Sequence, residues 1–188
     1  HYSDEHEEAI DWLDKCLSAS GQGESHVRKA YALKGISLRR LGRTEEAIKV
    51  FAKGIQEVGE DPELHFQLGH LFAELGRSQE AKEHYLACLE ADSSGAFTSF
   101  DRGIQGFKTM HNLAAVHVTL RDYEGARNWF LEALQQAPEF LPSAFALFDS
   151  ALDVGDWHTA EAMLAHVERM SRDRENLNQM EAKYRQRL

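Results

Sequence analysis

The sequence Leu41-Gly42-Arg43-Thr44-Glu45-Glu46-Ala47 recurs as Leu75-Gly76-Arg77-Ser78-Gln79-Glu80-Ala81, with every residue number raised by 34. The agreement continues on both sides, because Gly35 and Gly69 differ in number by the same amount, as do Phe51 and Tyr85. A fixed period of this length is typical of a repeat built from two helices and a turn. We therefore predict an all-α fold, an α-α superhelix in which helix pairs stack on one another.

The residue types at the repeated positions fit such a helix pair. Small residues such as Gly35 and Ala47 lie where the two helices of a repeat must approach closely. Gly42 and its equivalent follow the first helix, at a position suited to the left-handed backbone that glycine adopts most readily. Aromatic residues, namely Tyr31, Phe51, Phe72 and Tyr85, are then expected to fill the groove between neighbouring repeats.

The period divides residues 1–188 into a single array of one half repeat, four repeats and a capping helix. The numbers of Ala81 and Ala126 differ by 45, whereas those of Ala126 and Ala160 differ by 34 again, so the array loses its phase once and then recovers it. We predict a second helix at 4–17 whose first helix lies outside the chain, repeats at 28–61, 62–94, 107–140 and 141–170, and an amphipathic capping helix at 172–188.

The surplus over the period, eleven positions in all, falls within 95–106. Phe97, Phe100, Ile104 and Phe107 have the spacing of one helix face, which favours a backward extension of the first helix of repeat 3. The glycines within this stretch oppose a helix by about 1 kcal/mol each. We favour the helical extension, and a loop folded over the groove is the alternative.

Composition and charge exclude several classes of protein. The net charge is −10, from 21 basic and 31 acidic residues, which disfavours a nucleic-acid partner. No apolar run approaches the roughly 20 residues that a membrane span needs. The chain begins at His1 without Met, so we interpret it as a fragment, with any targeting signal outside it, and expect a cytoplasmic protein.

No motif in the sequence indicates catalysis, a metal or a cofactor. The near histidine pairs, His65 with His70 and His111 with His117, are spaced by five and six rather than by the four of a helical metal pair. Nucleophile-elbow, P-loop and dinucleotide-binding patterns are absent. We therefore predict that this chain is not an enzyme and carries neither a metal nor a cofactor.

A protein or peptide partner is the better expectation. Stacked repeats curl, and their first helices line the concave side, where cations, amides and apolar side chains could hold an extended peptide or one helix of a partner. Merely solvated helix faces are the alternative. The predicted partner-binding residues are Lys29, Ile36, Arg39, Arg40, Phe66, His70, Glu74, Lys108, His111 and Asn112.

The whole chain resembles tetratricopeptide-repeat (TPR) proteins. In the carboxylate-clamp members of that family, Lys and Asn on the concave face grip the C-terminus of a peptide. Lys29, Lys108 and Asn112 resemble this set, whereas Phe66 and His70 depart from it. The resemblance therefore implies a protein-interaction scaffold, and it does not imply a carboxylate clamp.

Two stretches are similar to something more particular. Residues 23–33, and residues 101–108 followed by Asn112-Leu113-Ala114, are similar to the repeat region of bacterial glycosyltransferases of the family 2 type. That resemblance implies a catalytic domain upstream, which holds a metal and a nucleotide sugar through Asp-x-Asp. The present chain has no Asp-x-Asp, so the alternative function is an accessory repeat arm. A third hypothesis is self-association through the exposed N-terminal repeat face.

Overall fold

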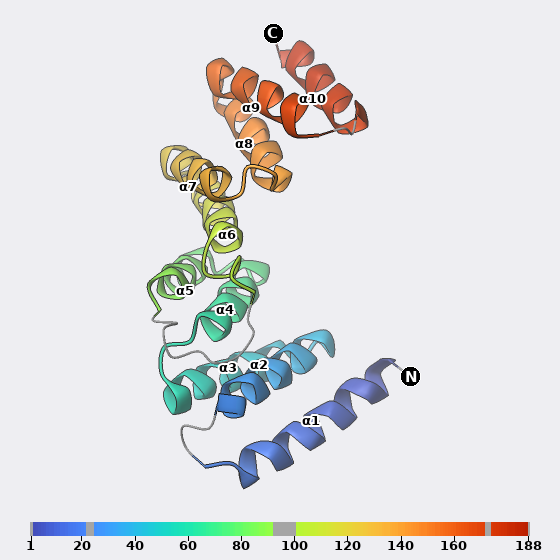
Figure 1. The fold of residues 1–188 in the computed structure, drawn as a ribbon, viewed down its shortest axis with the longest axis vertical. Coiled ribbons are helices and arrows are strands. Elements are labelled where there is room, and N and C mark those ends of the chain that lie inside the picture. The colour runs from blue at the N-terminus through green and yellow to red at the C-terminus, as the bar shows by residue number, and fades with distance from the viewer. Residues whose placement is uncertain (1, 22–24, 92–100, 172–173, 188) are drawn as a thin grey trace. The chain divides into compact units, whose positions relative to one another are not determined.

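The computed structural model describes residues 2–21, 25–91, 101–171 and 174–187. Within these ranges the chain forms ten α-helices and no strand, which confirms the predicted all-α fold (Figure 1). The helices are α1 (Tyr2–Ala19), α2 (Ser25–Arg40), α3 (Thr44–Val58), α4 (Pro62–Glu74), α5 (Ser78–Glu90), α6 (Phe107–Thr119), α7 (Tyr123–Gln136), α8 (Leu141–Val154), α9 (Trp157–Met170) and α10 (Arg174–Arg187).

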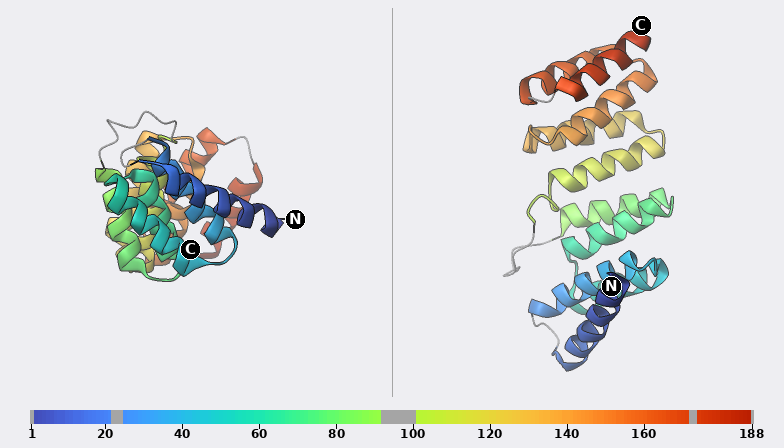
Figure 2. Two further views of the ribbon diagram at one scale, coloured as in Figure 1. Left: turned by 90° about the horizontal axis from the view of Figure 1, so that it is seen from below. Right: turned by 90° about the vertical axis from the view of Figure 1, so that its right-hand side faces the viewer.

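The helices form two compact units, residues 1–105 with α1 to α5 and residues 106–188 with α6 to α10. In each unit the closest packing is between consecutive helices, α2 with α3 and α4 with α5, then α6 with α7 and α8 with α9. Figure 2 shows the helices of each unit following one another in chain order. Each unit is thus a short stack of helix hairpins. None of the described helices is long and apolar enough to cross a membrane.

The repeated glycines occupy the positions that the pattern predicts. A Cβ atom at Gly69 would lie 2.6 Å from Cε1 of Tyr85, whose ring is buried against this point. Gly42, Gly76 and Gly155 each follow a first helix in the left-handed backbone region, with φ values of 74°, 72° and 74°. Arg121 takes the equivalent place between α6 and α7 with a φ of 60°, although it has a side chain.

The turns that lead into the second helices are held by different side chains in the two units. In the first unit an arginine precedes the helix and bonds the acid three positions on, with Arg43 Nε 2.7 Å from Glu46 Oε1. Arg77 and Glu80 repeat this arrangement at α5. The capping residue therefore leaves the first amides of the helix without a side-chain acceptor.

In the second unit an aspartate precedes the second helix and caps it directly. Asp122 Oδ1 accepts from the Gly125 N–H at 3.0 Å, and Asp156 Oδ1 accepts from the Thr159 N–H at 3.1 Å. Both are N-caps of the usual kind, in which a carboxylate satisfies an otherwise unpaired amide. The other oxygen of Asp122 lies 2.7 Å from Nδ1 of the buried His117 and so ties α6 to α7.

The predicted helical extension before α6 is wrong for residues 101–106, which form turns. Asp101 closes these turns, because its carbonyl accepts from the Ile104 N–H and its carboxylate from the Gly103 N–H, both at 2.9 Å. The turns also contact the end of α5, where Gln105 donates to the Ala91 carbonyl. Residues 95–100 of the predicted extension lie outside the described residues.

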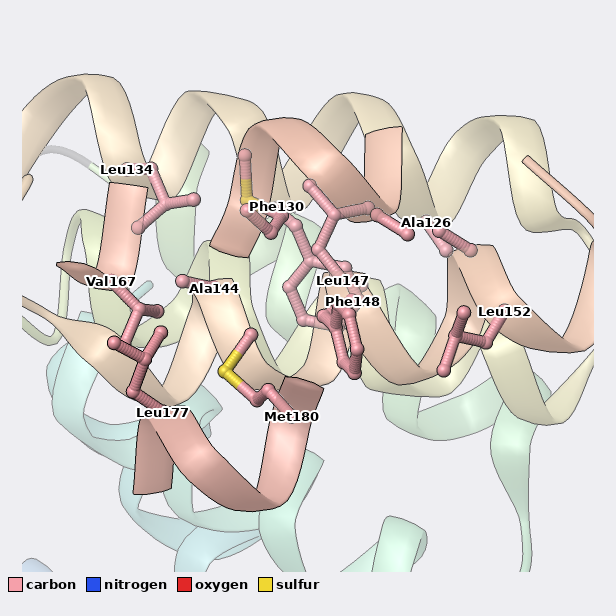
Figure 3. Close-up of a cluster of buried hydrophobic side chains, with 14 residues drawn as sticks. Ala126, Phe130, Leu134, Ala144, Leu147, Phe148, Leu152, Val167, Leu177 and Met180 are labelled. Carbon is pink, nitrogen blue, oxygen red and sulfur yellow. The ribbon is translucent and has the colours of Figure 1, made fainter. Parts of the chain in front are cut away.

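The capping segment joins the core of the second unit. Leu177 and Met180 of α10 are each 5% exposed and lie in one cluster with Phe130 of α7, Leu147 of α8 and Val167 of α9 (Figure 3). On the polar side of α10, Lys183 and Arg187 pair with Asp149 and Asp153 of α8, at a sequence separation of 34 in each case. One face of α10 therefore completes the core and the other carries charge.

Candidate partner-binding face of the first helices

The predicted partner-binding residues fall on first helices in both units. Seven of them lie on α2 and α4 of the first unit: Lys29, Ile36, Arg39, Arg40, Phe66, His70 and Glu74. The other three, Lys108, His111 and Asn112, lie on α6 of the second unit. One group thus lies in each unit.

Two of the three cations predicted to meet a partner in the first unit, Lys29 and Arg39, are engaged within the chain. Lys29 Nζ lies 2.8 Å from Glu63 Oε1, and Arg39 NH2 lies 2.7 Å from Glu74 Oε1. Each pair joins α2 to α4, and the sequence separations of 34 and 35 show that the two helices run parallel and in register. Arg39 and Glu74, both predicted to face a partner, therefore bind each other. Arg40 in the last turn of α2 is exposed.

Between these two ion pairs lies a strip of mainly apolar side chains. Leu33 and Ile36 follow Lys29 by four and seven positions and so share its side of α2. On α4, Phe66 and His70 occupy the positions that Ala32 and Ile36 occupy one repeat earlier. Leu33 is 43% exposed, and the other three are half-buried. We call Leu33, Ile36, Phe66 and His70 the first-helix strip; the ion pairs at its two ends, at Lys29 and Arg39 of α2, are about 15 Å apart along the helix, from the rise over ten residues.

Aromatic packing supports the strip from below. The Phe66 ring meets His70 edge-on at 4.8 Å, and both rings contact Tyr85 of α5 at 6.1 and 6.2 Å between centres. Tyr85 is 1% exposed and is the ring that fills the space beside Gly69. Burial, and then the charge of Arg39, lowers the pKa of His70 against the opposing effect of Glu74. His70 therefore presents a neutral imidazole at pH 7.

The predicted residues of the second unit are more involved in packing. His111 Nδ1 lies 3.1 Å from Ser143 Oγ of α8, and its ring stands edge-on to Phe140 at 5.4 Å. Burial lowers the pKa of His111. Lys108 lies 5.9 Å from the centre of the Phe107 ring, and Asn112 is half-buried. The contact of His111 with Ser143 joins α6 to α8.

Sequence reasoning missed Glu63, which fixes Lys29. The signal was available, because opposite charges one repeat apart on equivalent helix positions are placed to meet when the helices stack in register. Lys29 with Glu63 in the first unit and Asp149 with Lys183 in the second follow this rule. Before a cation of one repeat is assigned to a binding partner, its position therefore has to be compared with those of the acidic residues in the next repeat.

The described residues contain no group of three or more His, Cys, Asp or Glu side chains placed to hold a metal ion. A surface hollow of about 270 Å³ lies among α1, α2 and α3, with Ile10, Leu38 and Val50 in its lining. Another, of about 380 Å³, lies between α8 and α10. Both are bordered by ion pairs between their helices.

Comparison with protein families identifies the repeat. A tetratricopeptide-repeat model matches residues 29–57 and 62–94, and a second tetratricopeptide-repeat model matches residues 108–135. The chain therefore contains tetratricopeptide repeats, in both units. No curated protein sequence matches the chain significantly.

Solved structures agree on the fold. YrrB, described as a TPR protein with an unusual peptide-binding site, matches with a TM-score of 0.71 at 16% identity, over 95% of this chain and 84% of its own. MamA from Desulfovibrio magneticus RS-1 matches with a TM-score of 0.70 at 16% identity, over 88% and 85%. A chain of the APC/C hetero-tetramer Cut9–Hcn1 matches with a TM-score of 0.70 at 17% identity, over 96% of this chain but 33% of its own.

Proposed function

We propose that this chain is a non-catalytic interaction scaffold that binds a short peptide or one helix of a partner protein along the first-helix strip. The observation that carries the proposal is the strip itself: an exposed leucine, an isoleucine and two aromatic rings lie on parallel helices between two ion pairs. YrrB, similar in fold, is described as having a peptide-binding site, which supports the same use here.

The charges around the strip define the kind of partner. Lys29 and Arg39 are neutralised by Glu63 and Glu74, and His70 is uncharged at neutral pH, so the centre of the strip carries no net charge. Such a surface favours a partner segment with aliphatic or aromatic side chains over one held by its terminal carboxylate. The interval of about 15 Å between the two ion pairs accommodates about five extended residues or roughly three turns of helix.

Binding is tested with Leu33→Asp and a matched control. Leu75→Asp changes a leucine of the same unit that is 44% exposed, against 43% for Leu33, but that lies in the turn after α4. Peptides selected on the wild-type chain from a random display library are expected to be rich in apolar residues. They should bind Leu75→Asp as they bind wild type and should lose at least tenfold in affinity for Leu33→Asp.

Two results would refute the strip as the binding site. Selected peptides could bind Leu33→Asp with unchanged affinity, which would place their site elsewhere. Alternatively, both variants could lose binding equally while their circular dichroism spectra remain helical, which would mean that the peptides detect exposed leucines in general.

A second candidate function is the accessory arm of a family 2 glycosyltransferase. The similarity of residues 23–33 and 101–108 to the repeat region of such enzymes favours it. The gene upstream of His1 tests this candidate directly. If this region encodes a few hundred residues with an alternating strand and helix pattern and an Asp-x-Asp motif, the candidate is supported. If it encodes further helical repeats alone, the candidate is refuted.

Self-association through the N-terminal repeat face remains a proposal with one supporting observation. Trp12 on α1 is 62% exposed, the most exposed of the large apolar side chains in the described part of the chain. Light scattering of the wild type and of Trp12→Ser tests it. A dimer that dissociates on this substitution would support the proposal, and a monomeric wild type would refute it.

A further inference from the structure

Two imidazoles meet head-on between α4 and α5. His65 Nδ1 lies 2.9 Å from His84 Nδ1, within hydrogen-bond distance. The ring centres are 5.2 Å apart, about the largest separation that this contact allows, so the two nitrogens point straight at each other. A metal ion bound by both nitrogens would lie about 2 Å from each of them and off the line that joins them, and both lone pairs would have to point at it. The geometry instead fits a single proton held between the rings.

The hydrogen bonds decide where that proton lies. His65 Nε2 is 2.5 Å from Glu60 Oε2 and donates to this carboxylate. In neutral His65 the Nδ1 atom is then the acceptor, and His84 Nδ1–H is the donor. A proton added at Nε2 of His84 leaves this bond intact. The next proton must bind His65 Nδ1, which places two N–H groups face to face.

The two rings lie in a largely enclosed environment. The His65 side chain is buried, with 6% of the residue exposed. Phe72 of α4 stacks on His84 at 5.2 Å, and the Arg77 guanidinium lies 4.5 Å from the centre of the Phe72 ring. Glu60, Glu80 and Glu83 are the acids that face His84, and Glu80 is engaged by Arg77. Burial, and then His65, lowers the pKa of His84.

We propose that the His65–His84 contact is an acid-sensitive latch between α4 and α5. The latch is closed while the pair carries no added proton or one, and it opens when the second added proton binds. Because α4 carries Phe66 and His70 while α5 carries Tyr85 beneath them, opening also disturbs the first-helix strip. This last effect rests on the proposed function, whereas the latch itself does not.

His84→Asn is the variant that separates the latch from general acid sensitivity. The Asn amide nitrogen lies near the place of Nδ1, donates to neutral His65, and can turn its oxygen toward His65 once that ring is protonated. The variant therefore keeps a bond at both protonation states. Hydrogen exchange of α5 backbone amides in the intact chain, compared at pH 7.5, 6.5 and 5.5, reports the opening of this helix.

We expect the opening equilibrium of α5 in the wild type to rise below about pH 6.5, by up to a hundredfold per pH unit while the closed pair carries no added proton and by up to tenfold once it carries one, since the open state can bind two. In His84→Asn the rise should be markedly smaller, and α8 amides should respond alike in both proteins. Equal pH responses of α5 in the two proteins would overturn the proposal. If the variant does not fold, the nitrogen chemical shifts of the His65 and His84 rings in the wild type provide the test. Two doubly protonated rings with the α5 amides still protected from exchange would also overturn the proposal.

Discussion

At the scale of single residues, Arg121 is the exception in an otherwise regular set of turns. Gly42, Gly76 and Gly155 adopt the left-handed backbone after a first helix, and Arg121 adopts it with a φ of 60°. A side chain in this region costs about 1–2 kcal/mol, because Cβ approaches the following carbonyl oxygen. The turn between α6 and α7 is thus strained where the other three are relaxed.

We therefore expect Arg121→Gly to stabilise the second unit by about 0.5–1 kcal/mol, after the greater freedom of glycine in the unfolded chain is subtracted. Urea denaturation followed by tryptophan fluorescence measures the change. Arg121→Ala is the control, since it removes the same charge and keeps Cβ, and it should leave the unfolding midpoint near that of wild type. A midpoint that rises equally in both variants would attribute the gain to the lost side chain rather than to the backbone.

Residue spacing was a sound guide to steric partners and a poor guide to charged ones. Gly69 could be placed from the sequence at the close approach of two helices, although the ring that lies against it is Tyr85 of the same repeat and not a ring between neighbouring repeats. The engagement of Lys29 by Glu63 was not foreseen. Long side chains can reach several neighbours, so their partners depend on how successive helices stack.

At the scale of elements, α10 shows how the array is closed. Its two buried side chains, Leu177 and Met180, lie in the same cluster as side chains of α7, α8 and α9 (Figure 3). The charged residue Lys183 on the same helix is bonded to Asp149 at 2.7 Å and is largely exposed. Apolar burial, rather than the surface pair, should therefore hold α10 in place.

Leu177→Ala is expected to cost the second unit about 2–4 kcal/mol, from lost apolar burial and the cavity that remains. Lys183→Ala should cost less than about 1 kcal/mol, as exposed ion pairs do. Trp157 meets Tyr184 of α10 edge-on at 6.0 Å, so fluorescence near this contact follows the detachment of the helix. Equal losses in the two variants would show that the ion pair, not the core, positions α10.

The segment before α6 marks the limit of helix periodicity as a guide. Phe97, Phe100, Ile104 and Phe107 have helical spacing, yet residues 101–106 form turns. The spacing records only which side chains are apolar, whereas Asp101 binds the backbone of residues 103 and 104 and so competes with a helix. Local side-chain bonds of this kind have to be weighed beside the periodicity.

At the scale of the whole molecule, buried imidazoles make stability depend on pH. Burial lowers the pKa of His70 in the first unit and of His111 in the second. The unfolded chain, with an ordinary pKa near 6.5, binds protons that the folded chain does not bind as the pH falls. Stability is therefore complete above the unfolded pKa and declines as the pH falls from there toward the lowered folded values.

The unfolding free energy should fall between pH 7.5 and 5.5, by at most about 1.4 kcal/mol per pH unit for each imidazole that stays neutral in the folded state. Urea midpoints at three pH values measure this slope. His111→Gln should flatten it for the second unit, whereas His158→Gln, which changes an exposed residue, should leave it as in wild type. A wild-type midpoint that stays constant over this range would contradict the expectation.

The different caps of the two units have a practical consequence for anyone who edits this chain. Arg43 and Arg77 act through exposed charge pairs, which added salt screens. Asp122 and Asp156 instead accept hydrogen bonds from backbone N–H groups. Salt leaves these bonds largely unaffected, but protonation of the carboxylate removes them. Hydrogen bonds from Thr159 hold the pKa of Asp156 below its usual range, so that loss needs strong acid. Added salt is thus expected to loosen the turns of the first unit more than those of the second, whereas strong acid weakens both sets, because it protonates Glu46 and Glu80 as well as the two aspartates.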